Sequence, residues 1–304
     1  MTRIDAFAHI LTPNYYQEML KIAPEIPKQY PFIKIKTLLD LDERIKYWPA
    51  EDVKQVISFA NINAEDYVDG KQAAVLCREA NRELSEIVKN NSKYFESGVG
   101  MLPMNNISAA CDILEEIKKS KYLVGAQIFT RHLGKSIADP QFEPIFKKAS
   151  ELGLPLWMHP VFDNRKPDNN LVFSWEYELS QAMLQLVQND LFEKYPNIKI
   201  IIHHAGAMVP FFSGRINHIL DEKHADDFKK FYVDTAILGN SAALCLAIKY
   251  YGVDHILFGT DAPFAVMPAG ATEIISDAIN SICLSVDNLD KIYQQNYLKI
   301  VGGN

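Results

Sequence analysis

The segment Ile4-Asp5-Ala6-Phe7-Ala8-His9-Ile10-Leu11-Thr12-Pro13 distinguishes between two α/β folds for this chain. It has the composition of a buried strand followed by a turn. A doubly wound open sheet needs a glycine-rich phosphate-binding turn after its first strand, and residues 9–13 contain no glycine. Eight strand-like segments alternate with amphipathic segments along the whole chain, which is the pattern of a (β/α)8 barrel. The sequence therefore predicts a (β/α)8 TIM barrel.

The expected strands are rich in Val, Ile and Phe and span residues 4–9, 53–60, 97–103, 124–129, 155–159, 198–204, 231–235 and 256–261. The expected helices have apolar residues at helical spacing and span residues 73–90, 106–120, 142–152, 181–195, 208–220, 242–251, 271–283 and 289–300. Although 304 residues is long for one domain, α/β barrels of about 250 residues form a single unit, so we expect one domain over residues 1–304. The connection 10–52 is long and rich in Pro and Tyr, and we interpret it as an insertion over the barrel mouth.

Charge and cysteine usage exclude several classes of function. The chain has 31 Lys and Arg against 38 Asp and Glu, a net charge of −7, which argues against nucleic acid or an anionic membrane as the partner. Its four cysteines form no C-x-x-C pair, so neither a disulfide framework nor a zinc knuckle is indicated. The sequence has no signal-peptide pattern and no apolar run of the ~18 residues that a membrane span needs. We therefore expect a soluble, cytoplasmic protein.

Residues that can bind a metal stand at the ends of four expected strands. These residues are His9, His159, the pair His203-His204, and Asp261. In a barrel the catalytic groups lie at the C-terminal ends of strands, and imidazole with carboxylate suits zinc, manganese or iron. A single histidine at a strand end is more often a hydrogen-bonded structural residue, and Asp before Ala-Pro is a good turn residue. Four such residues at one face favour a metal site.

The pair His203-His204 cannot enter the barrel together if the strand continues through it. Side chains alternate along a strand, so two consecutive residues point to opposite faces. We expect His204 to point inward and His203 to pack against the helical layer.

Several motifs together resemble the amidohydrolase superfamily, in the branch that includes aminocarboxymuconate-semialdehyde decarboxylase and the resorcylate-type decarboxylases. The resemblance covers essentially the whole chain in order. It implies that His9, His159 and Asp261 bind one divalent metal, with zinc as the first candidate and manganese as the second. The matching motifs are Ile4-Asp5-Ala6-Phe7-Ala8-His9, Trp157-Met158-His159-Pro160, His204-Ala205-Gly206 with Pro210 and Gly214-Arg215-Ile216, Phe258-Gly259-Thr260-Asp261-Ala262-Pro263, and Asn296.

Phe7 is the main departure from this family pattern. The family carries a His-x-His pair on the first strand, and Phe7 occupies the first position of that pair. Residues i and i+2 share a face, so Phe7 and His9 should both enter the barrel, and a phenyl ring offers no lone pair to a cation. Either the metal is held by His9, His159 and Asp261 with open positions, or Phe7 fills the pocket and the protein works without metal or is inactive. We favour metal binding.

The resemblance places a non-oxidative decarboxylase first, acting on a small aromatic or unsaturated carboxylic acid. Asp261 or His204 would then handle the proton at the carbon that loses CO2. One alternative is a metal-dependent hydrolase of a lactone, ester or amide, in which Asp261 takes a proton from metal-bound water and His204 polarises the carbonyl. A second alternative is a degenerate barrel that binds a ligand without turning it over, which Phe7 supports.

A carboxylate substrate needs a cationic anchor, for which arginine is well suited. The candidates are Arg131, Arg165 and Arg215, each weighed equally against a surface ion pair. The resemblance implies a homodimer in which Arg215 reaches the neighbouring subunit's site. Aromatic residues near the fifth expected strand could contact the substrate, although such residues more often belong to the core. These residues are Trp157, Phe162, Phe173 and Trp175, with Phe7 facing the substrate from the first strand.

Overall fold

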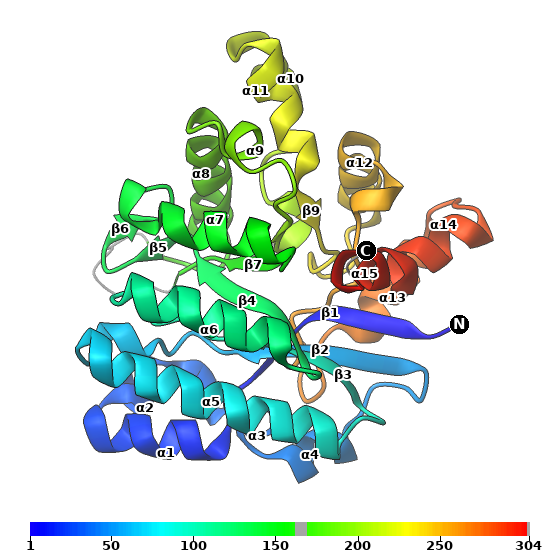
Figure 1. Ribbon diagram of the computed structural model, residues 1–304. Coiled ribbons are helices and arrows are strands. Elements are labelled where there is room, and N and C mark those ends of the chain that lie inside the picture. The colour runs from blue at the N-terminus through cyan, green and yellow to red at the C-terminus, as the bar shows by residue number, and fades with distance from the viewer. Residues whose placement is uncertain (162–168, 303–304) are drawn as a thin grey trace.

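The sheet of this protein is curled and parallel, and helices cover its outside (Figure 1). The computed structural model describes residues 1–161 and 169–302. Neighbouring strands follow the order β1-β2-β3-β4-β7-β8-β9, so each pairs with the next along the sheet. Their bounds are β1 (Arg3–Ile10), β2 (Val53–Phe59), β3 (Phe95–Gly100), β4 (Leu123–Phe129), β7 (Leu156–His159), β8 (Ile200–Ile202) and β9 (Tyr232–Val233).

The segment 256–262 closes the sheet into a barrel. It forms parallel bridges on both sides, between Val233 and Ile256 and between Ala8 and Ala262. The N–H of Ala6 donates to Phe258 O at 2.8 Å, which adds a backbone hydrogen bond on the β1 side. This segment fills the eighth strand position, so the prediction of a (β/α)8 barrel is confirmed.

Most predicted helices are present, with changes where the backbone turns. The predicted helix 181–195 is two helices, because Asp190 has a left-handed φ of 58° between them. The predicted helix 208–220 begins only at Ser213, since the residues before it form turns. A short antiparallel hairpin joins β5 (Arg131–His132) to β6 (Lys135–Ser136). The helices after β2 are α5 (Gly70–Asn90), α6 (Ile107–Lys119), α7 (Glu143–Leu152), α8 (Ser174–Gln188), α9 (Leu191–Lys194), α10 (Ser213–Ile219), α11 (Glu222–Asp227), α12 (Ser241–Tyr251), α13 (Thr272–Ser281), α14 (Val286–Asp290) and α15 (Asn296–Val301).

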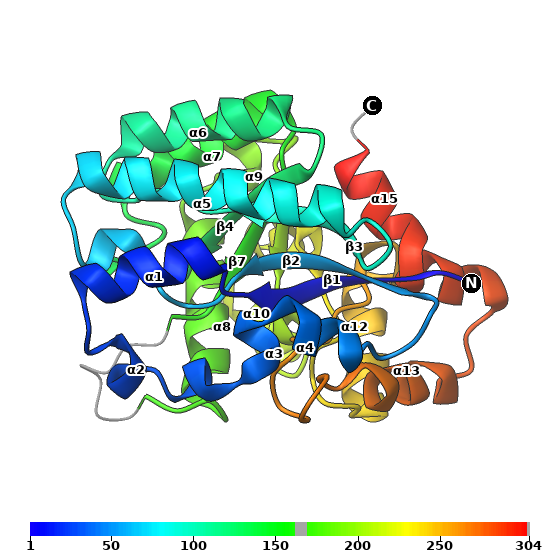
Figure 2. The same cartoon turned by 90° about the horizontal axis from the view of Figure 1, so that it is seen from below.

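The connection 10–52 folds into short helices rather than a loop. Figure 2 shows α1 beside α5, and α3 and α4 next to β1. The connection also meets the segment after Asp261, because Thr37 Oγ1 donates to Pro268 O at 2.9 Å and the Phe32 and Phe264 rings lie 5.9 Å apart. The helices are α1 (Pro13–Ile22), α2 (Ile26–Gln29), α3 (Lys36–Leu39) and α4 (Leu41–Lys46).

Trp157 fills the barrel interior. It is 1% exposed, and its indole N–H donates to Ala6 O at 3.0 Å. Gly125 makes room for the ring, because a Cβ at that position would lie 2.6 Å from Trp157 Cζ3. Trp157 therefore belongs to the apolar core. In the described part of the chain, no helix combines the length and apolar character needed to cross a membrane.

Candidate metal centre

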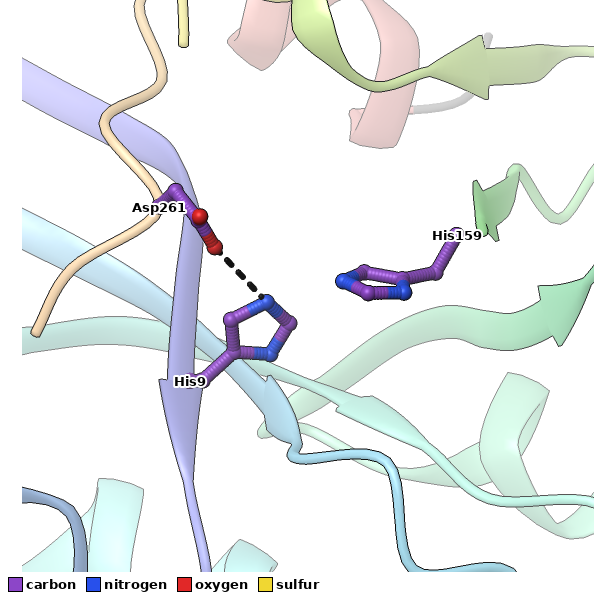
Figure 3. A group of neighbouring side chains, drawn as sticks. All are labelled: His9, His159 and Asp261. Atoms are coloured by element: carbon purple, nitrogen blue, oxygen red, sulfur yellow. Dashed lines mark ion pairs between the residues drawn. The ribbon is translucent and has the colours of Figure 1, made fainter. Parts of the chain in front are cut away.

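His9, His159 and Asp261 meet at one end of the barrel (Figure 3). His9 lies near the end of β1, His159 ends β7, and Asp261 lies in the closing segment. One ligand atom from each residue lies within 4.8 Å of the others, and His9 Nε2 is 3.2 Å from Asp261 Oδ1. These three residues, which are distant in the sequence, were selected because they end expected strands, and the barrel brings them together.

The surroundings of both histidines leave a lone pair on Nε2. His159 Nδ1 lies 2.6 Å from Pro160 O, which can only accept, so Nδ1 carries the proton. His9 Nδ1 lies 3.1 Å from Ser58 Oγ, whose hydroxyl points toward Ala8 O at 3.4 Å and can accept from Nδ1. Burial, with His9 and His203 nearby, holds the pKa of His159 well below its usual range, so this ring is neutral at pH 7.

The three residues fit a cation. His9 Nε2 and Asp261 Oδ1 are buried atoms, and neither has a hydrogen-bond partner among residues 1–161 and 169–302. Burying a lone pair without a partner is costly, and a divalent ion would satisfy both atoms. Two imidazoles and a carboxylate form a donor set typical of zinc, manganese or iron.

Phe7 forms the floor of this centre. Its ring is 1% exposed and lies 4.7 Å from the His9 ring and 5.6 Å from the His159 ring. The prediction that Phe7 and His9 share the barrel interior is therefore confirmed. Phe7 brings a phenyl face, not a donor atom, to a place bordered by two candidate ligands.

His203 also enters the interior, so the prediction that it packs against the helical layer is wrong. β8 ends at Ile202, and the backbone then turns, with left-handed φ values of 58° at His204 and 55° at Ala205. Strand alternation ends before this pair, and both rings face the site. The centroids of the His203 and His204 rings lie 3.5 Å and 5.9 Å from that of Phe7.

Two carboxylates hold these two histidines, the buried Asp234 and the partly exposed Glu176. Asp234 Oδ2 lies 2.7 Å from His203 Nδ1. Burial lowers the pKa of His203 well below its usual range and raises the pKa of Asp234 to about 6. Glu176 Oε1 lies 2.7 Å from His204 Nδ1. Burial opposes the charged form of His204, but the carboxylates of Glu176, Asp261 and Asp234, with Glu176 the largest contributor, together raise its pKa to about 9. His204 is therefore an imidazolium at neutral pH.

Of the predicted substrate contacts, Phe7 and Trp175 lie at this site, and the others in the described part of the chain do not. Trp157 lies in the core, Arg215 is exposed on α10, and Arg131 Nε donates to Glu178 Oε2 at 2.9 Å. Phe173 is 76% exposed, whereas the Trp175 ring lies 5.6 Å from the His159 ring. Arg165 and Phe162 lie outside the described residues.

Sequence reasoning missed Ser58, Asn61, Asp234 and Glu176. Ser58, Asn61 and Asp234 lie at or just beyond strand ends, where the rule that found His9 could have found them. Asn61 Nδ2 donates to Pro160 O at 3.3 Å and so supports the loop that orients His159. No sequence pattern singled out Glu176. It lies in the first turn of α8, which begins at Ser174, seven residues before the start of the predicted helix at residue 181.

Comparisons with known proteins identify a family and several similar decarboxylases. A family model described as Amidohydrolase matches residues 47–302. The 2-amino-3-carboxymuconate-6-semialdehyde decarboxylase of Dictyostelium discoideum is 28% identical over 242 residues, covering 74% of this chain and 67% of that one. The gamma-resorcylate decarboxylase of Polaromonas sp. (strain JS666) is 27% identical over 286 residues, covering 84% and 86%. A solved dihydroxybenzoic acid decarboxylase from Polaromonas sp. JS666, with bound manganese and 2-nitroresorcinol, superposes with a TM-score of 0.81 at 25% identity, covering 99% of this chain and 97% of that one.

Proposed function

The chain belongs to the amidohydrolase family, and on that premise we propose that it is a metal-dependent carboxy-lyase. The substrate class is a small aromatic or unsaturated carboxylic acid, because the similar proteins are named as decarboxylases of such acids. One observation carries the proposal: the buried Nε2 of His9 and Oδ1 of Asp261 form an ion pair at 3.2 Å beside His159, and neither atom has a hydrogen-bond partner in the described part of the chain.

His9 Nε2, His159 Nε2 and Asp261 Oδ1 would hold the metal. Three protein ligands leave positions open, which is the arrangement of a catalytic site. A bound ion would orient the substrate carboxylate and offset the negative charge near it. Manganese in the Polaromonas structure supports manganese, and the donor set also suits zinc, so both are candidates here.

His204 would deliver the proton. Its Nδ1 is held by Glu176, so the proton on Nε2 is available to the substrate. The Nε2–H bond breaks as a bond forms between the proton and the carbon that carries the carboxylate. The carbon–carboxylate bond then breaks, its electron pair stays on the substrate, and CO2 leaves. Neutral His204 regains its proton from solvent. In this assignment Asp261 acts as a metal ligand, since Oδ1 faces His9.

We also propose that the protein works as a homodimer. Phe211 and Phe212 are 75% and 38% exposed just before α10, and Arg215 is exposed on α10 itself. An apolar pair next to an exposed cation suits an interface with a second copy, through which Arg215 would contact a substrate carboxylate. Arg215→Ala should then weaken substrate binding in a protein whose sedimentation shows a dimer, and a monomer would contradict the proposal.

CO2 release tests the proposed reaction. The protein is loaded with Mn²⁺ or Zn²⁺ and incubated with 2,6-dihydroxybenzoate, 5-carboxyvanillate and 2-amino-3-carboxymuconate semialdehyde. CO2 release from at least one acid is expected, and Asp261→Asn should abolish it. Hydrolysis of lactones, esters or amides without release of CO2 from any acid would favour the hydrolase instead. No turnover of either class would favour the degenerate barrel.

A further inference from the structure

Arg44 is a buried cation that reaches the backbone of His9. It lies in α4, in the connection between β1 and β2, and is 4% exposed. Arg44 Nη1 donates to His9 O at 2.5 Å and is 3.3 Å from Thr37 O. Arg44 Nε and Nη2 both donate to Gln55 Oε1, at 3.1 Å and 2.8 Å. The guanidinium thus joins α4, the end of β1 and the side chain of a β2 residue.

The network continues from Gln55 to the residue before Asp261. Gln55 Nε2 lies 3.5 Å from Asp5 Oδ2 in β1. Asp5 is fully buried and accepts from Thr260 N at 2.9 Å and from Thr260 Oγ1 at 2.6 Å. Asp5 also accepts from Phe7 N at 3.2 Å. A chain of polar contacts therefore begins at the carbonyl of one candidate ligand and ends beside another.

Burying the charge of Arg44 costs free energy, which a residue that only fills space would not require. A buried charge is tolerated when it is paired or fully hydrogen-bonded. Within the described ranges, the hydrogen-bond partners of Arg44 are neutral oxygens, and Asp5 is reached only through Gln55. Arginine suits this place because its planar fork reaches both His9 O and Gln55 Oε1 in fixed directions, as well as Thr37 O, which a lysine ammonium cannot do.

We propose that Arg44 is a positioning residue of the metal centre, which sets the relative placement of His9 and Asp261 through His9 O and the Gln55–Asp5–Thr260 contacts. The inference rests on the proposed function, since it presupposes the metal. Outer contacts that orient ligands commonly change metal affinity when they are removed. His9 lies on the first strand of the barrel and Asp261 in the segment that closes it. The network links the two through side chains.

Binding of Mn²⁺ alone to the full-length protein tests the assignment, with unbound Mn²⁺ measured by electron paramagnetic resonance. Arg44→Met should weaken Mn²⁺ binding by about 10- to 100-fold. Arg44→Lys keeps the charge but cannot reach both acceptors, so it should weaken binding less. If the methionine variant does not fold, the lysine variant still decides the question. Thermal unfolding in the presence of a chelator gives the stability of each variant without metal.

Arg3→Met is the matched control. Arg3 lies at the start of β1, at the opposite end of the strand from His9. It donates to Asp52 at 2.8 Å and 3.0 Å and to Ser276 at 2.8 Å. Its loss should lower the unfolding temperature and leave Mn²⁺ affinity unchanged. Wild-type affinity in both Arg44 variants, or an equal loss in Arg3→Met, would overturn the role of Arg44. Failure of the wild-type protein to bind Mn²⁺ or Zn²⁺ would instead overturn the metal centre.

Discussion

The phenyl ring of Phe7 lies flat against the imidazole of His203, with centroids 3.5 Å apart and planes 12° apart. The same phenyl ring lies 4.7 Å from the His9 ring and 5.6 Å from the His159 ring, and the His203 ring is itself 5.5 Å from the His159 ring. This packing explains how a first-strand phenylalanine is accommodated among four imidazoles: it packs there as an aromatic residue. Among the described residues, the centre then has three candidate ligands, His9, His159 and Asp261.

Phe7→His should raise the affinity for divalent metal. The new imidazole would stand next to His9 and His159 and add a donor, and each ~1.4 kcal/mol gained is a factor of ten in affinity. We expect a gain of about tenfold or more, measured by competition with a chelator. Phe7→Leu is the control, because it removes the ring without adding a lone pair. Equal affinities in the two variants would show that position 7 does not reach the ion.

His159→Ala should abolish stoichiometric metal. The variant removes one of two imidazole donors and leaves the buried Nε2 of His9 facing Asp261. Elemental analysis of purified protein should find one Mn²⁺ or Zn²⁺ per wild-type chain and a loss of about 100-fold or more in affinity for the variant. His224→Ala changes a histidine bound to Asp221 on the surface and should keep the metal. Full occupancy in His159→Ala would contradict the ligand assignment.

Glu176→Gln should move the alkaline limit of activity to lower pH. His204 must be protonated to donate, and its pKa is raised to about 9, so wild-type kcat/KM should fall only as pH rises through about 9. Without the carboxylate of Glu176, burial is opposed only by the weaker effects of Asp261 and Asp234, so the pKa of His204 is lower and the fall should occur at a lower pH. At pH 8, kcat/KM of Glu176→Gln should be lower than that of the wild-type protein by about tenfold or more. Exposed Glu222→Gln should retain the wild-type profile. An unshifted limit in Glu176→Gln would remove His204 as the acid.

Asp5 should make the protein less stable as pH rises from about 4 to about 7. Burial raises its pKa to about 7 in the folded protein from 3.8, although Thr260 and Phe7 donate to it. In this window the folded state holds a proton that the unfolded state has lost, so the free energy of unfolding falls with pH and then levels off. The slope is at most about 1.4 kcal/mol per pH unit. Asp5→Asn, compared with wild type by urea unfolding with a chelator present, should lack this component. Parallel curves for the two proteins would contradict it.

The strands and the clustering of His9, His159 and Asp261 could be predicted because buried parallel strands leave apolar runs that end at the barrel mouth. The prediction that Trp157 contacts the substrate failed. Trp157 lies on the same face of β7 as His159, but it is two residues further from the barrel mouth, where that face is part of the core. His203 could not be assigned, because the alternation rule fails once β8 ends at Ile202. The helices α2, α3 and α4 span four to six residues, too short to show a helical period.

Closure of the barrel by 256–262 has a consequence for the order of assembly. His9 is made early in translation and Asp261 late, yet the two meet only when that last segment docks between β9 and β1. His9 and His159 therefore lack the third member of their cluster until the closing segment has docked. If the three residues bind a metal as proposed, tight binding would require the closed barrel.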